Sequence, residues 1–457
     1  MPLSARTIAA LLALVGLLPG PAAAAEVVSR TLDNGMEVFV KPDHRAPVVT
    51  SMVWYRVGGV DEHLGRTGIS HVLEHMMFKG TEEVGPGEFS EIIARNGGRD
   101  NAFTGQDYTA YFEQMAADRL EVALRLEADR MANLRLRAEE FEKEVRVVME
   151  ERRLRVEDDP RSLTHETLGS VAFDAHGYGH PIIGWMGDLK RLELADLRDW
   201  YARYYSPRNA RLVVVGDVAP GRVFRLAEKH FGGVAKGSDA AVIDPGSAPG
   251  PRGSREVDLE IPARVPYLAM GYRVPNLPAA EQEWEPYALR LLAGILDEGR
   301  SSRLPARLVR GAGVAASAGA YYDPESRAPG LFYLEGTPAP GTDPAKLETA
   351  LAEEVRRLQR EPVGEAELAR VKRQIAASEV FQRDSVFYQA MQIGRLETIG
   401  YGHEYLDTYL ERVRAVTPDQ IRQVARKYLV PQRRTLVRLK PSPDGGASKP
   451  GEADHDG

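Results

Sequence analysis

The residues best suited to do chemistry in this sequence form one short run, His71-Val72-Leu73-Glu74-His75. On an α-helix, residues four apart lie about 40° apart around the axis, so the two imidazole side chains project from one face. Two neutral histidines at this spacing can share one zinc ion. Glu74 lies on the same broad face and is placed to take a proton from a metal-held water without ligating the metal. The run therefore predicts an inverted H-x-x-E-H zinc site for metal-assisted peptide hydrolysis.

A zinc site of this kind needs a third protein ligand, with the fourth position left for water. The acidic stretch 139–155 offers several carboxylates, most of which belong to a solvated helix face. Glu144 and Glu151 are two helical turns apart and share a face, whereas Glu150 is displaced by about 100°. Spacing favours Glu151 over Glu150 as the ligand and leaves both open.

The composition restricts the chemistry further. The chain of 457 residues contains no cysteine, which excludes disulfide scaffolds, thiolate zinc sites, cysteine-ligated iron–sulfur clusters and thiol proteases. Lys and Arg number 59, Asp and Glu number 66, and the net charge is −7. This balance argues against a general nucleic-acid surface and against bulk attraction to acidic lipid. Any metal must therefore be held by histidine and carboxylate, and we expect no nucleic-acid partner.

The two ends of the chain are predicted to lie outside the fold. An apolar stretch at 8–18 follows Arg6 and precedes a Pro-Gly-Pro break and an A-x-A cleavage site, which is typical of a signal peptide over 1–25. The apolar stretch is short for a membrane span, and no later stretch resembles a transmembrane helix. We therefore expect export to the periplasm, cleavage before Glu26 and no stable membrane insertion. The stretch 441–457 is rich in Pro, Gly, Ser and Asp, which predicts a disordered tail.

Between these ends the chain divides at a linker, 237–255, which is the internal stretch richest in Pro, Gly and Ser. The linker separates two blocks of about 200 residues, 26–236 and 256–440, and this is a common domain size. Both blocks end with a helix, a proline turn and an apolar strand. Equivalent residues are Asp196 and Asp419, Arg203 and Arg426, and Tyr205 and Tyr428. The similarity suggests an ancient duplication.

Hydrophobic patterning predicts the elements of each block. The apolar, β-branched stretches 48–55 and 212–215 predict strands. Helical spacing with charged outer faces predicts helices at 118–133, 139–155, 344–360 and 364–398. Strands and helices are interspersed without a glycine-rich phosphate loop. The predicted class is α+β, with two related domains that each hold a mostly antiparallel sheet and helices packed on one side.

The chain resembles the pitrilysin/insulinase family of zinc metallopeptidases, and in particular the short two-domain type of the mitochondrial processing peptidase β subunit. The resemblance covers nearly all of 26–440. It depends on the H-x-x-E-H run, on Glu144 and Glu151, and on four further segments. These segments are Asn101-Ala102-Phe103-Thr104, His180-Pro181-Ile182-Ile183-Gly184, Tyr205-Ser206-Pro207-Arg208-Asn209 and Ser301-Ser302-Arg303-Leu304.

The resemblance implies roles for individual residues. In the family the third ligand is a glutamate about 76 residues after the second histidine, and Glu151 stands at that distance from His75. The resemblance therefore implies one Zn²⁺ per chain, held by His71, His75 and Glu151. It also implies that Glu74 is the catalytic base and that Glu144 assists catalysis.

The segment 96–112 is predicted to form a turn, a short exposed strand at 101–104, and a second turn and strand. Taken alone, this pattern is that of an ordinary hairpin. The resemblance implies an edge strand that pairs with the peptide substrate, with Asn101 and Ala102 as substrate-binding residues. Backbone pairing accepts many sequences, which suits a peptidase of unfolded chains.

The second block departs from the family pattern. Family members carry an Arg and, seven residues later, a Tyr after the Ser-Ser-Arg-Leu segment, and both reach the substrate at the zinc. Here an ungapped alignment places Val309 and Ala316 at these positions. Arg310 is one place off, and Tyr321 could take the tyrosine position only with an insertion. The chain therefore resembles the metal-bearing half of a two-chain enzyme whose homologous partner subunit carries the Arg/Tyr pair.

The sequence thus predicts a zinc-dependent endopeptidase that hydrolyses short or unfolded peptides by metal-activated water, as the catalytic subunit of a heterodimer. Two other classes of protein share the expected fold. One is a scaffold protein, such as the core subunits of respiratory complexes, and the other is a module that binds peptide without cleaving it. The intact H-x-x-E-H run argues against a scaffold, because scaffold members lose ligands.

Overall fold

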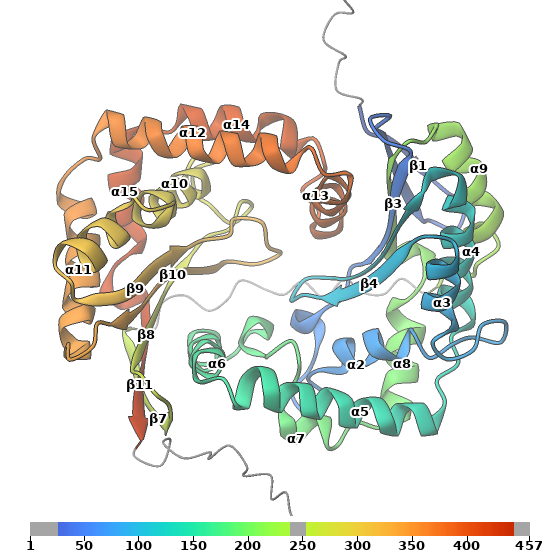
Figure 1. The fold of residues 1–457 in the computed structure, drawn as a ribbon, viewed down its shortest axis with the longest axis horizontal. Helices are drawn as coiled ribbons and strands as arrows, with labels where there is room; N and C mark the ends of the chain where they lie inside the picture. The colour runs from blue at the N-terminus through green and yellow to red at the C-terminus, as the bar shows by residue number, and fades with distance from the viewer. Residues whose placement is uncertain (1–25, 238–252, 443–457) are drawn as a thin grey trace, which may run out of the picture.

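Residues 26–237 and 253–442 are described by the computed structural model, and they form two sheets with their helices (Figure 1). The predicted signal peptide at 1–25 lies outside the described residues, as do 238–252 of the predicted linker and 443–457 of the predicted tail. Pro441 and Ser442, which the sequence placed in the tail, end strand β11. No helix within the described ranges is both long and apolar enough to cross a membrane.

The first sheet has six strands in the order β1-β2-β6-β3-β5-β4. They are β1 (Val28–Thr31), β2 (Glu37–Pro42), β3 (Val48–Tyr55), β4 (Arg99–Thr104), β5 (Thr109–Ala116) and β6 (Ala210–Gly216). β2 and β6 pair in parallel, and all other neighbours pair antiparallel. The predicted strands at 48–55 and 212–215 are both in this sheet, and β4 forms one of its edges.

The second sheet has five strands in the order β7-β11-β8-β10-β9. They are β7 (Arg255–Pro262), β8 (Tyr267–Val274), β9 (Ala315–Tyr321), β10 (Gly330–Pro338) and β11 (Arg434–Ser442). β7 and β11 pair in parallel and the other neighbours antiparallel, so the sheet repeats the arrangement β2-β6-β3-β5-β4. This confirms the predicted α+β class with two related, mostly antiparallel sheets.

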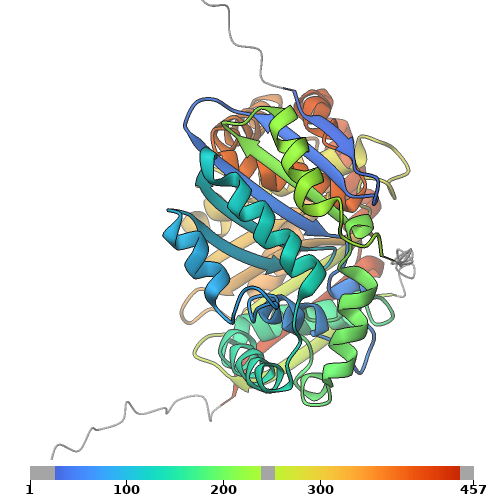
Figure 2. The same cartoon turned by 90° about the vertical axis from the view of Figure 1, so that its right-hand side faces the viewer.

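One face of the first sheet shares a large apolar core with most helices of the first half. These helices are α2 (Ile69–Met76), α3 (Glu88–Arg95), α4 (Leu120–Asn133), α5 (Ala138–Arg152), α7 (Met186–Leu189), α8 (Leu194–Tyr204) and α9 (Pro220–Phe231). Figure 2 shows α4 and α9 lying across the outer face of this sheet. The prediction of one helix at 139–155 ends too late, because the chain widens into a π-helical turn at Arg153–Glu157.

The second sheet packs in the same way against α10 (Glu285–Asp297), α11 (Pro344–Arg360), α12 (Glu365–Gln382), α14 (Tyr405–Ala415) and α15 (Pro418–Tyr428). The stretch 364–398, predicted as one helix, is two helices, α12 and α13 (Val386–Ile399). Ser385 begins the second helix, and its hydroxyl accepts a hydrogen bond from the backbone N–H of Tyr388 at 3.2 Å. A serine N-cap of this kind is a local signal for a helix start.

Each sheet is covered on its second face by one helix from the other half, in addition to the predicted helices on one side. Helix α13 packs on the first sheet, where Ala390 and Ile393 join an apolar cluster with Trp54. Helix α6 (Pro160–Ala172) packs on the second sheet, where Leu168 joins a cluster with Leu331. Both faces of the central strands are therefore buried, which explains the unbroken apolar run at 212–215.

Candidate active site

Helix α2 carries the H-x-x-E-H run and is fixed at its first turn. The backbone N–H groups of Gly68 and Ser70 donate to the buried carboxylate of Glu62 at 2.7 and 2.9 Å. This carboxylate accepts hydrogen bonds from N–H groups that have no partner within the helix. Gly68 has a φ of +86°, and a Cβ there would lie 2.6 Å from the carbonyl oxygen of Ile183. Glycine at this position thus lets the helix begin against its neighbouring loop.

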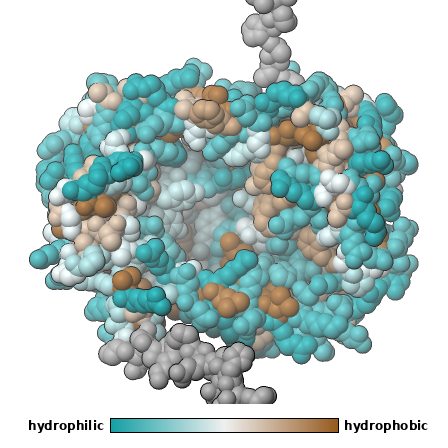
Figure 3. Space-filling view, viewed as in Figure 1, coloured by the Kyte–Doolittle hydropathy of each residue, from teal (hydrophilic) through white to brown (hydrophobic). Residues whose placement is uncertain are grey.

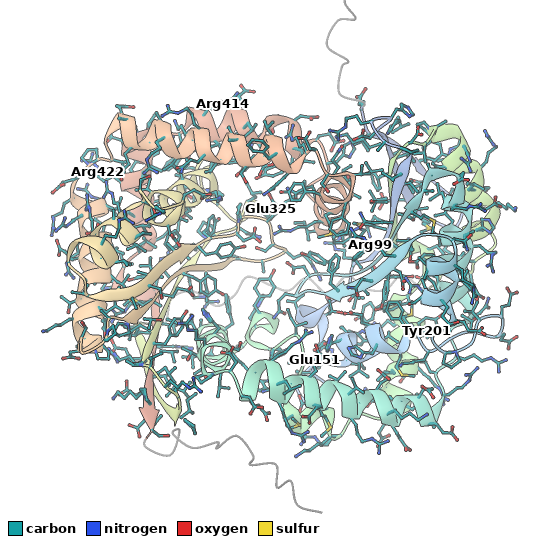
Figure 4. The ribbon with its side chains drawn as sticks, viewed as in Figure 1. Arg99, Glu151, Tyr201, Glu325, Arg414 and Arg422 are labelled. Atoms are coloured by element: carbon teal, nitrogen blue, oxygen red, sulfur yellow. The ribbon has the colours of Figure 1, made fainter. Side chains whose placement is uncertain are left out.

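Three ligand-type side chains converge where α2 faces α5. Glu151 Oε2 lies 3.5 Å from His75 Nε2 and 3.9 Å from His71 Nε2. All three side chains offer a ligand atom within 4.8 Å of the others. The second oxygen of Glu151 pairs with Arg155 at 2.6 Å, which leaves Oε2 turned toward the histidines. Figure 4 shows Glu151 on the side of α5 that faces α2.

The donor set fits a zinc ion. Bonds of about 2.0–2.2 Å to a tetrahedral zinc separate the ligand atoms by about 3.4 Å, close to the separations found here. Burial lowers the pKa of His71 to about 3, so its ring is neutral and keeps a lone pair for a metal. Its Nδ1 is buried and has no hydrogen-bond partner among the described residues. A metal ion would therefore meet two imidazoles and one carboxylate already in place.

Glu150, the alternative that spacing left open, lies elsewhere. Its side chain is 58% exposed and pairs with Arg153 at 2.7 Å along the outer face of α5. The structure thus brings Glu151, and not Glu150, to the two histidines. The displacement of about 100° around the helix accounts for this difference.

Glu144 contacts the site from behind His75. Its Oε2 lies 3.1 Å from His75 Nδ1, the ring nitrogen on the far side from Glu151. Its Oε1 pairs with Lys79 at 2.6 Å. A carboxylate in this position orients a ligand histidine and fixes its tautomer. The contact of Lys79 with Glu144 was missed from the sequence, because Lys79 lies past the end of α2, four residues after His75.

Glu74 lies beside the three ligand-type residues and accepts a hydrogen bond from the hydroxyl of Thr104, at the end of β4. Burial raises the pKa of the Glu74 carboxyl above its ordinary value, and the hydrogen bond from Thr104 opposes this rise. A raised pKa brings a carboxylate closer to the range suited to general-base work at neutral pH. The contact with Thr104 was also missed from the sequence, although the residue lies in a segment that carries the resemblance.

A cavity of about 720 Å³ opens onto these residues. Figure 3, in the view of Figure 1, shows a hollow between the two halves. Its wall includes His71, Glu74, Glu151 and residues 101–104 of β4. Among the described strands β4 pairs only with β5, so its other edge is free. The structure therefore places Asn101 and Ala102 beside the histidines, on an unpaired strand edge.

The remaining histidine groups differ from this arrangement. His180 lines the cavity, where its backbone carbonyl accepts a hydrogen bond from Gln106 at 2.8 Å. Within the described ranges a second ligand-type group consists of Glu397, His403 and Glu404. There one oxygen of Glu397 lies 2.7 Å from the backbone nitrogen and 2.6 Å from Nδ1 of His403. One oxygen of this carboxylate is thus already engaged by His403, and the third member of the group, Glu404, is 75% exposed.

Val309 and Ala316, which stand at the family's Arg and Tyr positions, and the alternatives Arg310 and Tyr321 are not among the residues that line the cavity. Val309 packs against the core of its own half, and Ala316 lies on β9 with only a methyl side chain. Arg310 is exposed and donates to the backbone of Arg300. Tyr321 is 60% exposed and lines a neighbouring hollow.

Two sheets of the same plan, with a candidate histidine–glutamate metal site in the first half, define the class of protein. The family model for the insulinase family (peptidase family M16) matches residues 37–185, and the model for the peptidase M16 inactive domain matches 191–375. The chain belongs to this family.

Relatives and solved structures agree with this assignment. The chain is 36% identical over 284 residues to the zinc protease PqqE of Helicobacter pylori, an alignment that spans 62% of the chain and 63% of that relative. It is 27% identical to YmxG, an uncharacterized zinc protease of Bacillus subtilis, across 90% of the chain and 98% of the relative. The crystal structure of a protease from Helicobacter pylori matches with a TM-score of 0.87 and 30% identity, across 91% of this chain and 100% of that one. These similarities confirm the resemblance that the sequence motifs indicated.

Proposed function

We propose that this chain is a zinc-dependent endopeptidase. The observation that carries the proposal is the convergence of His71, His75 and Glu151 on one point, beside the carboxylate of Glu74. Zinc bound there would lower the pKa of a water molecule and polarise a peptide carbonyl. The ligand set, two histidines and one glutamate with a fourth position open, is typical of catalytic zinc.

The residues around the metal position divide the work. Glu74 takes the proton of the attacking water, and Thr104 holds its carboxylate in place through a hydrogen bond. Glu144 orients His75 through Nδ1, and its own charge is balanced by Lys79. We propose one zinc ion per chain on this basis.

The substrate is a short or unfolded peptide that adds to the free edge of β4. The backbone of this strand lies beside the metal position, and backbone pairing is indifferent to most side chains. In the structure the backbone N–H of Ala102 donates a hydrogen bond to the side-chain oxygen of Asn101 at 2.9 Å. A peptide carbonyl that accepts from this N–H would take the place of the Asn101 oxygen. Asn101 and Ala102 are therefore the proposed substrate-binding residues.

The chain works with a homologous partner subunit. Hydrolysis develops negative charge on the carbonyl oxygen, and loss of one donor to that oxygen typically reduces the rate by ~10²–10³. Val309 and Ala316 offer no side-chain donor. We therefore expect the lone chain to be nearly inactive and a chain with the Arg/Tyr pair to restore cleavage as a 1:1 heterodimer. Strong cleavage by the lone chain that Arg310→Ala or Tyr321→Phe abolishes would contradict this partnership.

Zinc content and turnover, measured on matched variants, test the proposal. Elemental analysis should find one zinc in the wild type and in Glu74→Gln, and little in His71→Ala, His75→Ala or Glu151→Gln. Glu150→Gln is the matched control for Glu151→Gln and should retain zinc. A quenched fluorescent peptide should be cleaved by the wild type with its partner and not by Glu74→Gln. Peptide binding without cleavage by every zinc-loaded form would instead favour the non-catalytic module.

We also propose that the mature protein acts in the periplasm. The proposal rests on the signal-peptide pattern at 1–25. N-terminal sequencing of the exported protein should begin at or near Glu26. An intact Met1 in the soluble fraction would contradict it.

A further inference from the structure

A buried ion pair joins the two halves next to the cavity. Arg327, in the loop between β9 and β10, places its guanidinium 2.9 and 3.0 Å from the two carboxylate oxygens of Asp61 in the first half. Both side chains are only 2% exposed. Figure 4 labels Glu325 of the same loop near the centre of the molecule, between the halves. Breaking such a pair on one side leaves a buried charge without its partner, which is strongly unfavourable.

The same loop binds the first half through its backbone. The N–H of Arg327 donates to the carboxylate of Asp107 at 3.1 Å, and this carboxylate also accepts the hydroxyl of Tyr178 at 2.8 Å. The N–H of Ala328 in turn donates to the Tyr178 hydroxyl at 3.0 Å. Asp107 follows the end of β4, and Tyr178 lines the cavity. The loop is therefore fixed to two segments that border the site.

The turn that contains Asp61 is hydrogen-bonded to the residues that follow β4. It lies in the short turn Gly59–Asp61, whose N–H groups at Gly59 and Val60 donate to the carbonyl oxygens of Gly105 and Gln106 at 3.1 and 2.9 Å. The turn fits tightly, because a Cβ on the preceding residue, Gly58, would lie 2.4 Å from the Gly105 oxygen. Gly105 directly follows Thr104, whose hydroxyl binds Glu74.

We propose that Arg327 is a positioning residue for the site. By binding Asp61 it holds the Gly59–Asp61 turn against Gly105, and this fixes Thr104 beside Glu74. The second half thus contributes to the chemistry without supplying a ligand. The inference builds on the proposed endopeptidase function, because Glu74 matters here as the proton acceptor.

A double-mutant cycle tests the route through Thr104. Zinc-loaded chain, with its partner where the partner is needed, is assayed as wild type, Arg327→Met, Thr104→Val and the double variant. We expect Arg327→Met to lower kcat at least ten-fold with full zinc content, and to lower it less than three-fold in the Thr104→Val background. Non-additivity of this kind marks residues that act through one another. If Arg327→Met lowers kcat by the same factor in the wild-type and the Thr104→Val backgrounds, the proposal is overturned.

Amide hydrogen exchange tests the same coupling without turnover. In the zinc-loaded full chain the amides of Gly59, Val60 and Gly105 should exchange at least ten-fold faster in Arg327→Met. The control is Arg45→Met, which removes another ion pair between the halves, to Asp384 at 2.9 Å, and should leave these amides unchanged. Unchanged exchange in Arg327→Met, or an equal increase across the whole first sheet, would overturn the proposal.

These two readouts separate the possible failures. If the zinc-loaded wild-type chain cleaves no peptide even with its partner subunit, the proposed function is wrong, whereas the exchange experiment still measures the contact between the halves. If Arg327→Met does not fold, Arg327→Lys carries the same cycle and the same exchange measurement. Lysine retains the charge but cannot bind both oxygens of Asp61 in the paired geometry of a guanidinium. For Arg327→Lys we expect the same non-additive loss of kcat and the same faster amide exchange, each smaller than in Arg327→Met. If its effect on kcat is independent of Thr104→Val and its amides exchange as in the wild type, Arg327 is not a positioning residue.

Discussion

Replacing Glu144 with glutamine tests whether the residue behind His75 tunes the metal site. The substitution keeps the size of the side chain but removes the negative charge that faces His75 Nδ1 at 3.1 Å and Lys79 at 2.6 Å. Loss of such a partner of a ligand histidine typically weakens metal binding by about 10–100-fold. This corresponds to about 1.4–2.7 kcal/mol of binding free energy. Because Glu144 is buried, water does not readily replace the lost contact, and we expect a value toward the upper end.

The assay is competition for zinc between the metal-free full chain and a chelator of known affinity. Glu150→Gln is the matched control, since it makes the same chemical change on the same helix at an exposed position that pairs only with Arg153 among the described residues. We expect its zinc affinity to equal that of the wild type. Equal affinity of Glu144→Gln and wild type would refute the reasoning and leave the contact with His75 without a role in metal binding.

Three further predictions concern stability. Gly394→Ala should destabilise the fold by about 1–3 kcal/mol in urea unfolding, because a Cβ there would lie 2.0 Å from the buried indole nitrogen of Trp54. Gly169→Ala, on α6, should stabilise it slightly, because a Cβ there would meet only the carbonyl oxygen of Tyr178 at 3.8 Å, an ordinary van der Waals contact. Burial raises the pKa of Glu325 to about 7, so the folded chain keeps a proton that the unfolded chain releases above about 4.5. The free energy of unfolding should therefore fall by up to about 3 kcal/mol as pH rises from about 4.5 to about 7 and then level off, and Glu325→Gln should remove that part of the decline. Chelator treatment should lower the Tm of the wild type, and leave the Tm of His71→Ala unchanged, if zinc binds only the native state.

The local part of the site was predictable from sequence. Helical periodicity alone places His71 and His75 on one face, because the argument spans little more than one turn of helix, whereas it favours Glu151 over Glu150 without deciding between them. The strand predicted at 101–104, which lies within β4, was predictable because turn residues bound it, whereas its place at a sheet edge was implied only by the family resemblance. These features depend on neighbours in the chain.

Contacts between distant segments were not predictable. The pairs Arg327–Asp61 and Thr104–Glu74 join residues 266 and 30 positions apart, and a single sequence carries no signal for such partners. Periodicity did not predict α6 at all, and it does not show which sheet receives α6 or α13. The break between α12 and α13 is different, because the Ser385 cap was a readable signal that the helical pattern around it obscured.

Each half packs one helix on the sheet of the other half, α13 on the first sheet and α6 on the second. The candidate metal site in the first half is therefore supported by both halves. Glu151 lies at the end of α5, and the chain then passes through the turn Arg153–Glu157 into α6, which packs on the second sheet. Arg152, next to Glu151, pairs with Glu166 of α6 at 2.8 Å and with the carbonyl oxygen of Gly184 at 2.8 Å. Glu151, the proposed third ligand, is thus held between a helix that is anchored on the second half and a loop of the first. Since Arg327 fixes the other side of the cavity from the same half, an isolated first half would lack both supports. We therefore expect the second half, which supplies none of the three candidate ligands, to be required for the geometry of the candidate zinc site.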